Sequence, residues 1–463
     1  MTFRHGFRTI VFASVLITLV HLPGVLASDI PLDSPLYPVL DRYWSEGRLD
    51  GYRPDQRPIS FREAKDLLDS LDRPVILENL IPNGNISLTP RLGWEGGDKG
   101  FVPDNRSGIP VSGGLVAGAE FILNVHPFSL FADGRLPLTG SGDRFFKEAY
   151  GQFRWGKLQF TVGKENMWWG PGRRGSLLLT DNAEPRKIFR LDNYPDFTLP
   201  GFLKHLGGVR VSFFLSRLDD DRPGFVPDPV MGGLKIGFSP NPNLIFSLNR
   251  TFLFGGEGRD EDFGAFLDVL LGRPGSESAS AAQNVIGNQI AGFSVIWRAL
   301  ADAQPFTLYV DGAGEDAAGW TPSKWAFLGG IYLPRIGQSE MFDVRLEAAS
   351  TDLGYSGWYT HEDYPYTYRG RLMGHPMGGG AEDLYLELGV YPVPASRLAL
   401  TVARTRETDP GGGHDTLMTL GLKGDLWTSA RTVTWQWVRK DREGPAAVPD
   451  EGDLYSVTVK FRL

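Results

Sequence analysis

Residues 342–348 read FDVRLEA, a stretch in which every second side chain is apolar. This period of two predicts a β-strand with an apolar face and a face that carries three charges. The apolar side chains are Phe342, Val344, Leu346 and Ala348, and the charged ones are Asp343, Arg345 and Glu347. Similar alternation recurs at residues 209–216, 384–390 and 455–463. Such strands belong either to a membrane barrel, with the apolar face toward lipid, or to a soluble sandwich with charge on its outer faces.

The lengths of the connections between the predicted strands distinguish these two folds. Outer-membrane barrels alternate short periplasmic turns with long outer loops. Read from the C-terminus backward, long and short links between the predicted strands alternate. The long ones include those near 441–452 and 255–287, the short ones those near 425–429 and 240–243, and the one near 313–323 is of medium length. We therefore predict an all-β transmembrane barrel of about 18 antiparallel strands in the bacterial outer membrane. The first strand is expected near Ile86–Trp94. A strand near Ser176–Thr180 is included because the number of barrel strands must be even.

The first part of the chain has a different pattern. Residues 1–27 resemble a signal peptide, because Arg4 and Arg8 precede an apolar run that ends in a small-residue cleavage site at Ala27. Residues 28–82 show helical spacing before Gly47 and again after a capping box of Ser60 and Glu63. We expect a small α-helical periplasmic module or plug there and the barrel over residues 83–463. Short amphipathic helices cannot bury their own apolar faces, so they should dock on the near end of the barrel; the alternative is an independent module that binds another protein.

Composition narrows the possible classes of protein. The chain has no cysteine, so no disulfide framework holds it together. Its formal net charge of −8 disfavours nucleic acid as a partner. After residue 27 no apolar stretch reaches the length of a membrane-spanning helix, so insertion into a membrane would be by strands.

Residues 163–185, GKENMWWGPGRRGSLLLTDNAEP, contain the most distinctive motif. Its G-x-G-x-x-G pattern is not a dinucleotide site, because Pro171 lies within the turn and no βαβ unit follows. We expect a tight turn that holds Trp168 and Trp169 beside Arg173 and Arg174, which suits sugars carrying carboxylates or phosphates. The alternative is that both tryptophans belong to the barrel wall or fill the lumen.

This motif resembles the capsule assembly Wzi family of outer-membrane proteins. The matching positions are Trp168, Trp169, Gly170, Pro171, Gly172, Gly175, Ser176, Leu177, Asn182, Ala183 and Pro185. The resemblance also covers the signal, the N-terminal helices and the strands. It implies a surface lectin that helps retain or organise capsular polysaccharide, with that polysaccharide, outer-membrane lipid and the polysaccharide export machinery as partners.

The predicted outer loop at residues 351–380 is rich in aromatic side chains. Exposed aromatic rings favour binding, since they bury a large area with few rotatable bonds. We therefore expect polysaccharide contacts at Trp358, Tyr359, Tyr364, Tyr366 and Tyr368. The alternative is that residues 358–368 form a small hairpin over the barrel mouth, with the rings packed on one another.

Two function hypotheses remain. The leading one is a non-enzymatic barrel that binds capsular or extracellular polysaccharide and helps its attachment at the cell surface. The alternative is a porin-like channel for oligosaccharides or other solutes, because strands such as 342–348 present charge toward the lumen. We predict no catalysis and no cofactor, because no G-x-S-x-G motif occurs and the histidines after residue 27 are scattered. We predict no metal site, because the acidic loops at 219–221 and 257–262 lack calcium-ligand spacing.

Overall fold

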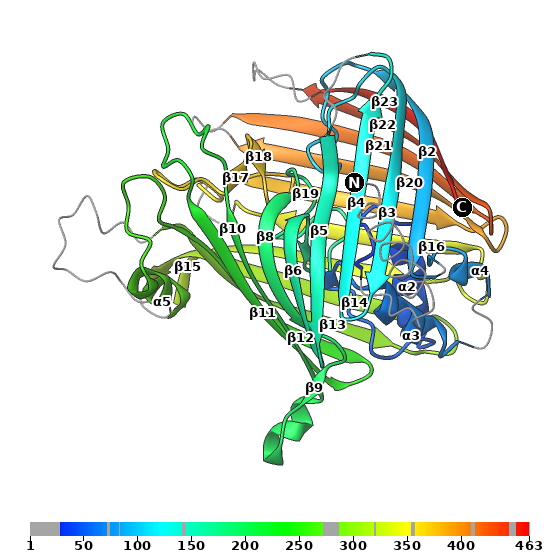
Figure 1. Ribbon diagram of the computed structural model, residues 1–463, viewed down its shortest axis with the longest axis horizontal. Coiled ribbons are helices and arrows are strands. Elements are labelled where there is room, and N and C mark those ends of the chain that lie inside the picture. Colours follow the sequence, from blue (N-terminus) through cyan, green and yellow to red (C-terminus); the bar gives the residue numbers. More distant parts are fainter. Residues whose placement is uncertain are drawn as a thin grey trace, which may run out of the picture.

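A closed β-barrel forms most of the molecule (Figure 1). The computed structural model describes residues 28–71, 75–82, 84–140, 145–271, 287–318, 321–352, 357–408, 413–443 and 451–462. Within these ranges 18 antiparallel strands close the barrel, so the predicted fold class is confirmed. The expected signal peptide, residues 1–27, lies outside the described residues. No helix in the described ranges is long and apolar enough to cross a membrane.

Each barrel strand pairs with the barrel strands that precede and follow it in sequence, and β2 closes the ring against β23. The barrel strands are β2 (Ile86–Gly97), β3 (Gly114–Val125), β4 (Phe128–Pro137), β5 (Phe145–Trp155), β6 (Leu158–Glu165), β8 (Arg186–Asn193), β10 (Gly208–Arg217), β11 (Val230–Asn241), β12 (Leu244–Phe254), β13 (Gln289–Ala299), β14 (Phe306–Ala318), β15 (Thr321–Leu333), β16 (Phe342–Ser350), β19 (Ala381–Val390), β20 (Ser396–Thr408), β21 (His414–Trp427), β22 (Arg431–Glu443) and β23 (Gly452–Phe461).

The two faces of the strands lie as the alternation predicts. In β16, Leu346 is 51% exposed on the outside of the barrel, whereas Arg345 and Glu347 are 6% and 2% exposed on the inside. In β19, Leu384 is exposed outside and Tyr385 is buried inside. An apolar exterior with charge directed inward is the arrangement of a barrel that faces lipid.

The connections alternate in length around the barrel. Short turns at 242–243 and 428–430 lie at one end, and long connections lie at the other. The long connections include residues 255–288, with α5 (Phe263–Leu271), and residues 351–380, with β17 (Thr367–Tyr368) and β18 (Arg371–Leu372). The link expected near 313–323 is shorter than predicted, because β14 and β15 continue to Ala318 and Thr321. At the short-turn end, residues 194–207 form a longer connection with β9 (Phe197–Thr198) and η1 (Gly201–Leu206), which projects beyond the barrel (Figure 1).

One predicted strand is wrong. Residues 176–180 form no barrel strand; apart from an isolated bridge between Trp169 and Leu179, they run through the interior. The strand that completes the even number is β8 (Arg186–Asn193), which pairs with β6 and β10. The three consecutive leucines at 177–179 are fully buried because they pack against other interior segments rather than against lipid.

The N-terminal residues dock inside the short-turn end of the barrel, where Figure 1 shows them in blue. They comprise α2 (Leu36–Ser45), β1 (Gln56–Arg57), α3 (Phe61–Leu68) and α4 (Val75–Glu78). We call residues 28–82 the plug. Helix α2 ends before Gly47, as predicted, and Arg298 of β13 donates to the carbonyls of Trp44 and Leu49 at 2.7 and 2.9 Å.

The predicted capping box at the start of α3 is only half formed. The backbone N–H of Glu63 donates to Ser60 Oγ at 3.1 Å, as expected. The Glu63 carboxylate instead accepts from Arg210 Nη1 of β10 at 3.0 Å. An ion pair to the barrel wall therefore replaces the reciprocal cap and ties α3 to the lumen.

Candidate functional site

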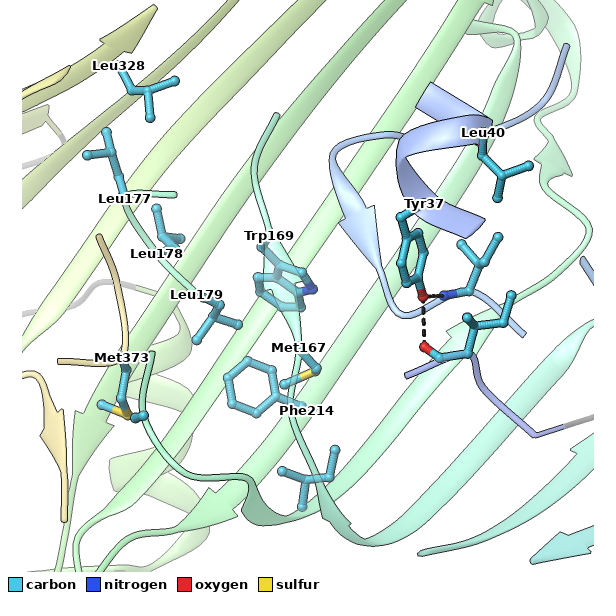
Figure 2. Packing of buried hydrophobic residues seen from close by; sticks show 14 of the residues in the cluster. Tyr37, Leu40, Met167, Trp169, Leu177, Leu178, Leu179, Phe214, Leu328 and Met373 are labelled. Atoms are coloured by element: carbon cyan, nitrogen blue, oxygen red, sulfur yellow. Dashed lines mark hydrogen bonds between the residues drawn. The ribbon is translucent and has the colours of Figure 1, made fainter. Parts of the chain in front are cut away.

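The two tryptophans of the motif lie inside the lumen. They form β7 (Trp168–Trp169), which pairs with β1 of the plug in the register Gln56 to Trp169 and Arg57 to Trp168. The Trp169 ring packs edge-on against Phe214 of β10, with centroids 5.3 Å apart. Figure 2 shows Trp169 between Met167, Phe214 and the run of leucines at 177–179. Both tryptophans are therefore parts of the lumen filling, which is one of the two alternatives that the sequence left open.

Two carboxylates of the barrel wall hold the turn that follows the tryptophans. Glu347 of β16 accepts from the backbone N–H groups of Arg173 and Arg174, at 2.6 and 2.9 Å. Asp311 of β14 accepts from the N–H of Leu177 at 3.3 Å. Bonds of this kind, with a charged acceptor, are stronger than neutral ones. Residues 170–177, which we call the motif turn, are thus fastened across the lumen to two distant strands.

The glycines of the motif turn are required by close packing. A Cβ at Gly172 would overlap the carbonyl oxygen of Gly175, and one at Gly175 would overlap the ring of His375. Gly170 has φ +147°, and a Cβ there would overlap Ser176. The motif therefore encodes a turn that must fit tightly between other segments of the interior.

The arginine side chains of the motif turn form ion pairs with other segments. Arg174 is buried, and its Nη1 lies 2.9 Å from Oδ2 of Asp104 in the outer loop between β2 and β3. Lys440 of β22 contacts the same carboxylate at 3.2 Å. Burial alone would raise the pKa of Asp104, but Lys440 and Arg174 outweigh that effect and lower it. Arg173 is partly exposed, and its Nε lies 3.5 Å from Glu387 of β19.

The last motif residues continue this interior path. Asn182 donates from Nδ2 to the carbonyl of Leu372 at 3.2 Å, and its Oδ1 accepts from the N–H of Asn105 at 3.3 Å. Pro171 and Pro185 are buried. Asn182 therefore joins the loop between β2 and β3 to the hairpin of β17 and β18.

The aromatic rings expected to be exposed in the loop at residues 357–380 are buried, so the expectation of exposed rings is wrong. Five rings that we expected to contact polysaccharide are each less than a tenth exposed, namely Trp358, Tyr359, Tyr364, Tyr366 and Tyr368. β17 and β18 form a small hairpin, and Tyr359 stacks on Tyr366 with centroids 5.5 Å apart. The hydroxyls of Tyr359 and Tyr366 donate to the carbonyls of Leu177 and Leu178 at 2.7 and 2.9 Å. The loop thus packs on the motif segment, because the rings find partners there that local sequence does not reveal.

A cavity of about 690 Å³ remains between the plug and the inner wall formed by β20–β23 and β2. We call it the lumenal cavity. Three of the four predicted sugar-binding residues of the motif line it, Trp168, Arg173 and Arg174, whereas Trp169 does not. Its other polar groups were not singled out from the sequence, although the alternation at 455–463 had already placed several on a polar face. They include Lys423, Thr434, Ser456, Thr458, Lys460 and Arg462.

Among the described residues, no group of three or more histidine, cysteine, aspartate or glutamate side chains is arranged to hold a metal ion. The polar groups that line the cavity offer hydrogen bonding and ion pairing. Its hydroxyl, guanidinium and ammonium groups suit a ligand rich in hydroxyls and negative charge.

Comparisons with known proteins agree with this architecture. The family model described as capsule assembly protein Wzi matches residues 112–441. A Klebsiella pneumoniae protein, described as an uncharacterized 55.8 kDa protein in the cps region, is 29% identical over 194 residues, which are 41% of this chain and 37% of that protein. The match thus spans little more than a third of that relative's length.

Two solved structures are informative about the fold. Wzi of Escherichia coli, described as a carbohydrate-binding β-barrel involved in group 1 capsule assembly, is similar with a TM-score of 0.75 and 20% identity, over 93% of this chain and 99% of that one. OccAB4 of Acinetobacter baumannii is similar with a TM-score of 0.51 and 9% identity, over 82% of this chain and 97% of that one. At these identities the likenesses concern the fold.

Proposed function

Because this chain belongs to the capsule assembly protein Wzi family, we propose that it binds capsular or extracellular polysaccharide and helps attach it to the cell surface. The protein is an integral β-barrel of the outer membrane. That location places its long loops on the cell exterior, where a capsule is assembled. Many weak contacts along a repeating polymer supply avidity without a deep pocket at the surface.

The filled lumen is the observation that carries this proposal. The plug occupies one end, and the motif turn crosses the interior between Glu347 and Asp311. Arg345, which would line an aqueous lumen under the channel hypothesis, lies 3.5 Å from Asp41 of the plug. A lumen filled with paired charges supports a binding protein rather than an open pore.

The lumenal cavity is the observation that favours the alternative, a channel for oligosaccharides or other solutes. Conductance in planar bilayers tests it: a large steady current through the full-length protein would favour the channel, and silence would favour binding. Deleting residues 28–82 should then raise the conductance, since those residues occupy the lumen.

We also propose three partners and no catalytic role. The polysaccharide is the first partner, and the exposed apolar exterior supports outer-membrane lipid as the second. The export machinery is the third, supported by η1, which projects at the short-turn end with Phe202 80% exposed. Replacing Phe202 by Ser should reduce co-purification with export components and leave insertion of the barrel unchanged.

A deletion strain tests the function directly. Surface-attached and released polysaccharide are measured in the wild type, in the deletion strain and in the strain complemented with the full chain. We expect the attached fraction to fall on deletion and to return on complementation, with total polymer unchanged. An unchanged partition would refute the proposal. Purified protein should also retain the isolated polymer on a surface, which separates direct binding from an effect on export.

A further inference from the structure

The lumenal cavity opens toward the short-turn end of the barrel. Its lining includes Ser429, an exposed residue of the turn between β21 and β22, and Arg462 just after β23. At its other end the lining includes Ser107 and Ile109, which are buried residues of the loop between β2 and β3. An even number of strands with short turns at this end makes it the periplasmic end. The cavity therefore has an exposed lining residue at the periplasmic end and is bounded at its other end by the loop between β2 and β3.

The wall of the cavity is lined by small hydroxyl groups in register. Thr434 of β22 lies opposite Thr458 of β23, and Thr432 lies opposite Lys460. All four line the cavity. Neighbouring strands place such side chains about 5 Å apart, so the wall offers a regular set of donors and acceptors. A ligand with hydroxyl groups along its length suits this surface.

The cavity is more basic than the molecule as a whole. Lysine and arginine outnumber aspartate and glutamate in its lining, although the chain carries a formal net charge of −8. Arg462 forms no ion pair among the described residues. The ammonium of Lys423 lies 3.6 Å from Asp425, whose other oxygen accepts from Thr434, and the Lys423 side chain is 30% exposed. These two cations are available to an additional anion.

A carboxylate of the plug already faces this basic wall. Asp33 lies 3.0 Å from Lys147 Nζ, and about half of its side chain (49%) is exposed to the cavity. Burial alone would raise the pKa of Asp33, but the positive charges of Lys147, Lys460 and Lys423 outweigh that effect and lower it. The cavity thus stabilises a negative charge at the position where the plug supplies one.

We propose that the lumenal cavity binds a short saccharide segment bearing carboxylates, which reaches it from the periplasmic side. Its carboxylates pair with Lys423 and Arg462, and its hydroxyls bond to the threonines of β22 and β23. The volume of about 690 Å³ is in the usual range for small-molecule sites. This inference rests on the proposed function, because the segment belongs to the same class of polymer, and it adds a second site within the barrel.

The experiment uses the full chain in detergent micelles and two trisaccharides of equal length. Calorimetry measures the affinity for trigalacturonate, which is acidic, and for maltotriose, which is neutral. We expect at least tenfold tighter binding of the acidic sugar, weakened by raising NaCl from 50 to 500 mM. Lys423→Gln and Arg462→Gln should each weaken it about fivefold to tenfold, since each removes a charge-assisted bond. The control, Arg404→Gln, removes an exposed cation from the outer face of β20 and should bind as the wild type does.

Periplasmic access is tested by blocking the mouth of the cavity. The chain has no cysteine, so Ser429→Cys can be labelled singly with a bulky maleimide. The label should abolish binding of trigalacturonate. The same label at Asp260→Cys, in an outer loop, should leave binding unchanged.

The outcomes separate this inference from the proposed function. Equal affinity for both sugars, wild-type affinity in Lys423→Gln and Arg462→Gln, or full binding by the blocked Ser429→Cys protein would each overturn the cavity site. If the wild type still retains the long polymer in that case, the proposed function stands without it. If the wild type binds neither polymer nor trisaccharide, the proposed function itself is refuted.

Discussion

Replacing Glu347 by Gln tests whether the motif turn is fastened to the barrel wall. The Glu347 carboxylate accepts from the N–H groups of Arg173 and Arg174 and from the Tyr309 hydroxyl, at 2.6, 2.9 and 2.6 Å. The amide retains one acceptor oxygen and turns an NH₂ group toward the other contacts. A buried N–H left without a partner costs roughly 1–3 kcal/mol. The population in which the turn is open should therefore rise roughly 5- to 150-fold, because 1.4 kcal/mol corresponds to a factor of ten.

Trypsin reports this opening directly, because Arg173 and Arg174 are cleavage sites within the turn. When opening and closing are fast, the cleavage rate follows the population of the open form. Mass spectrometry of the folded protein in detergent should show cleavage after these two residues in Glu347→Gln well before it appears in the wild type. Glu382→Gln, which changes an exposed carboxylate of β19, is the matched control. Equal cleavage rates in Glu347→Gln and the wild type would refute the reasoning.

Three further predictions concern packing, pH and the plug. Gly172→Ala should lower the free energy of unfolding by about 1–3 kcal/mol, because the added Cβ overlaps Gly175. The control Gly329→Ala should leave it unchanged, because its Cβ meets only the Tyr309 carbonyl at 3.8 Å. Urea titration in detergent measures both variants. Burial lowers the pKa of His375 to about 4, so this histidine binds a proton more readily in the unfolded chain than in the folded one. The free energy of unfolding should therefore fall by roughly 2.5 kcal/mol as the pH is lowered from 7.5 to 4.5. His375→Gln should remove that part of the pH dependence, and an identical pH profile in the variant would contradict the assignment. Arg298→Gln should speed hydrogen exchange in residues 36–49, since it removes the hydrogen bonds to the carbonyls of Trp44 and Leu49. Arg404→Gln is the control. Equal exchange rates in the two variants would show that α2 does not depend on these bonds.

The strand pattern could be predicted from sequence because lipid and lumen impose it at each position. Leu346 and Glu347 illustrate this, since their exposures follow directly from the alternation. The count of strands was right, but one strand was assigned to residues 176–180 instead of β8. In β8 the inward positions alternate between charged and apolar, Arg186, Ile188 and Arg190, and the outward Lys187 is exposed. A strand that carries charge on both faces lacks the clear period of two on which the prediction depends.

The interior arrangement could not be predicted, because it is set by contacts between residues far apart in sequence. Tyr359 and Tyr366 look like surface aromatics in a polar loop, yet their hydroxyls donate to Leu177 and Leu178. The motif glycines could be recognised as a tight turn, but the partner that makes Gly175 necessary is His375, some 200 residues later. Local spacing indicates that a segment turns, and only the closed fold determines what surrounds it.

The distribution of paired charges explains why one side of the lumen is available and the other is not. On the side of β16 and β19, inward charges have partners: Arg397 contacts Asp343 and Glu387 at 3.1 and 2.8 Å, and Arg345 contacts Asp41 of the plug. Withdrawing the plug would remove Asp41 from Arg345 and leave that inward charge without this partner. The plug is thus a permanent part of that wall. Arg462 lies on the opposite side, lines the cavity and has no ion pair among the described residues. An incoming anion gains an interaction there without breaking one, which is why a ligand should bind along β21–β23 rather than displace the plug.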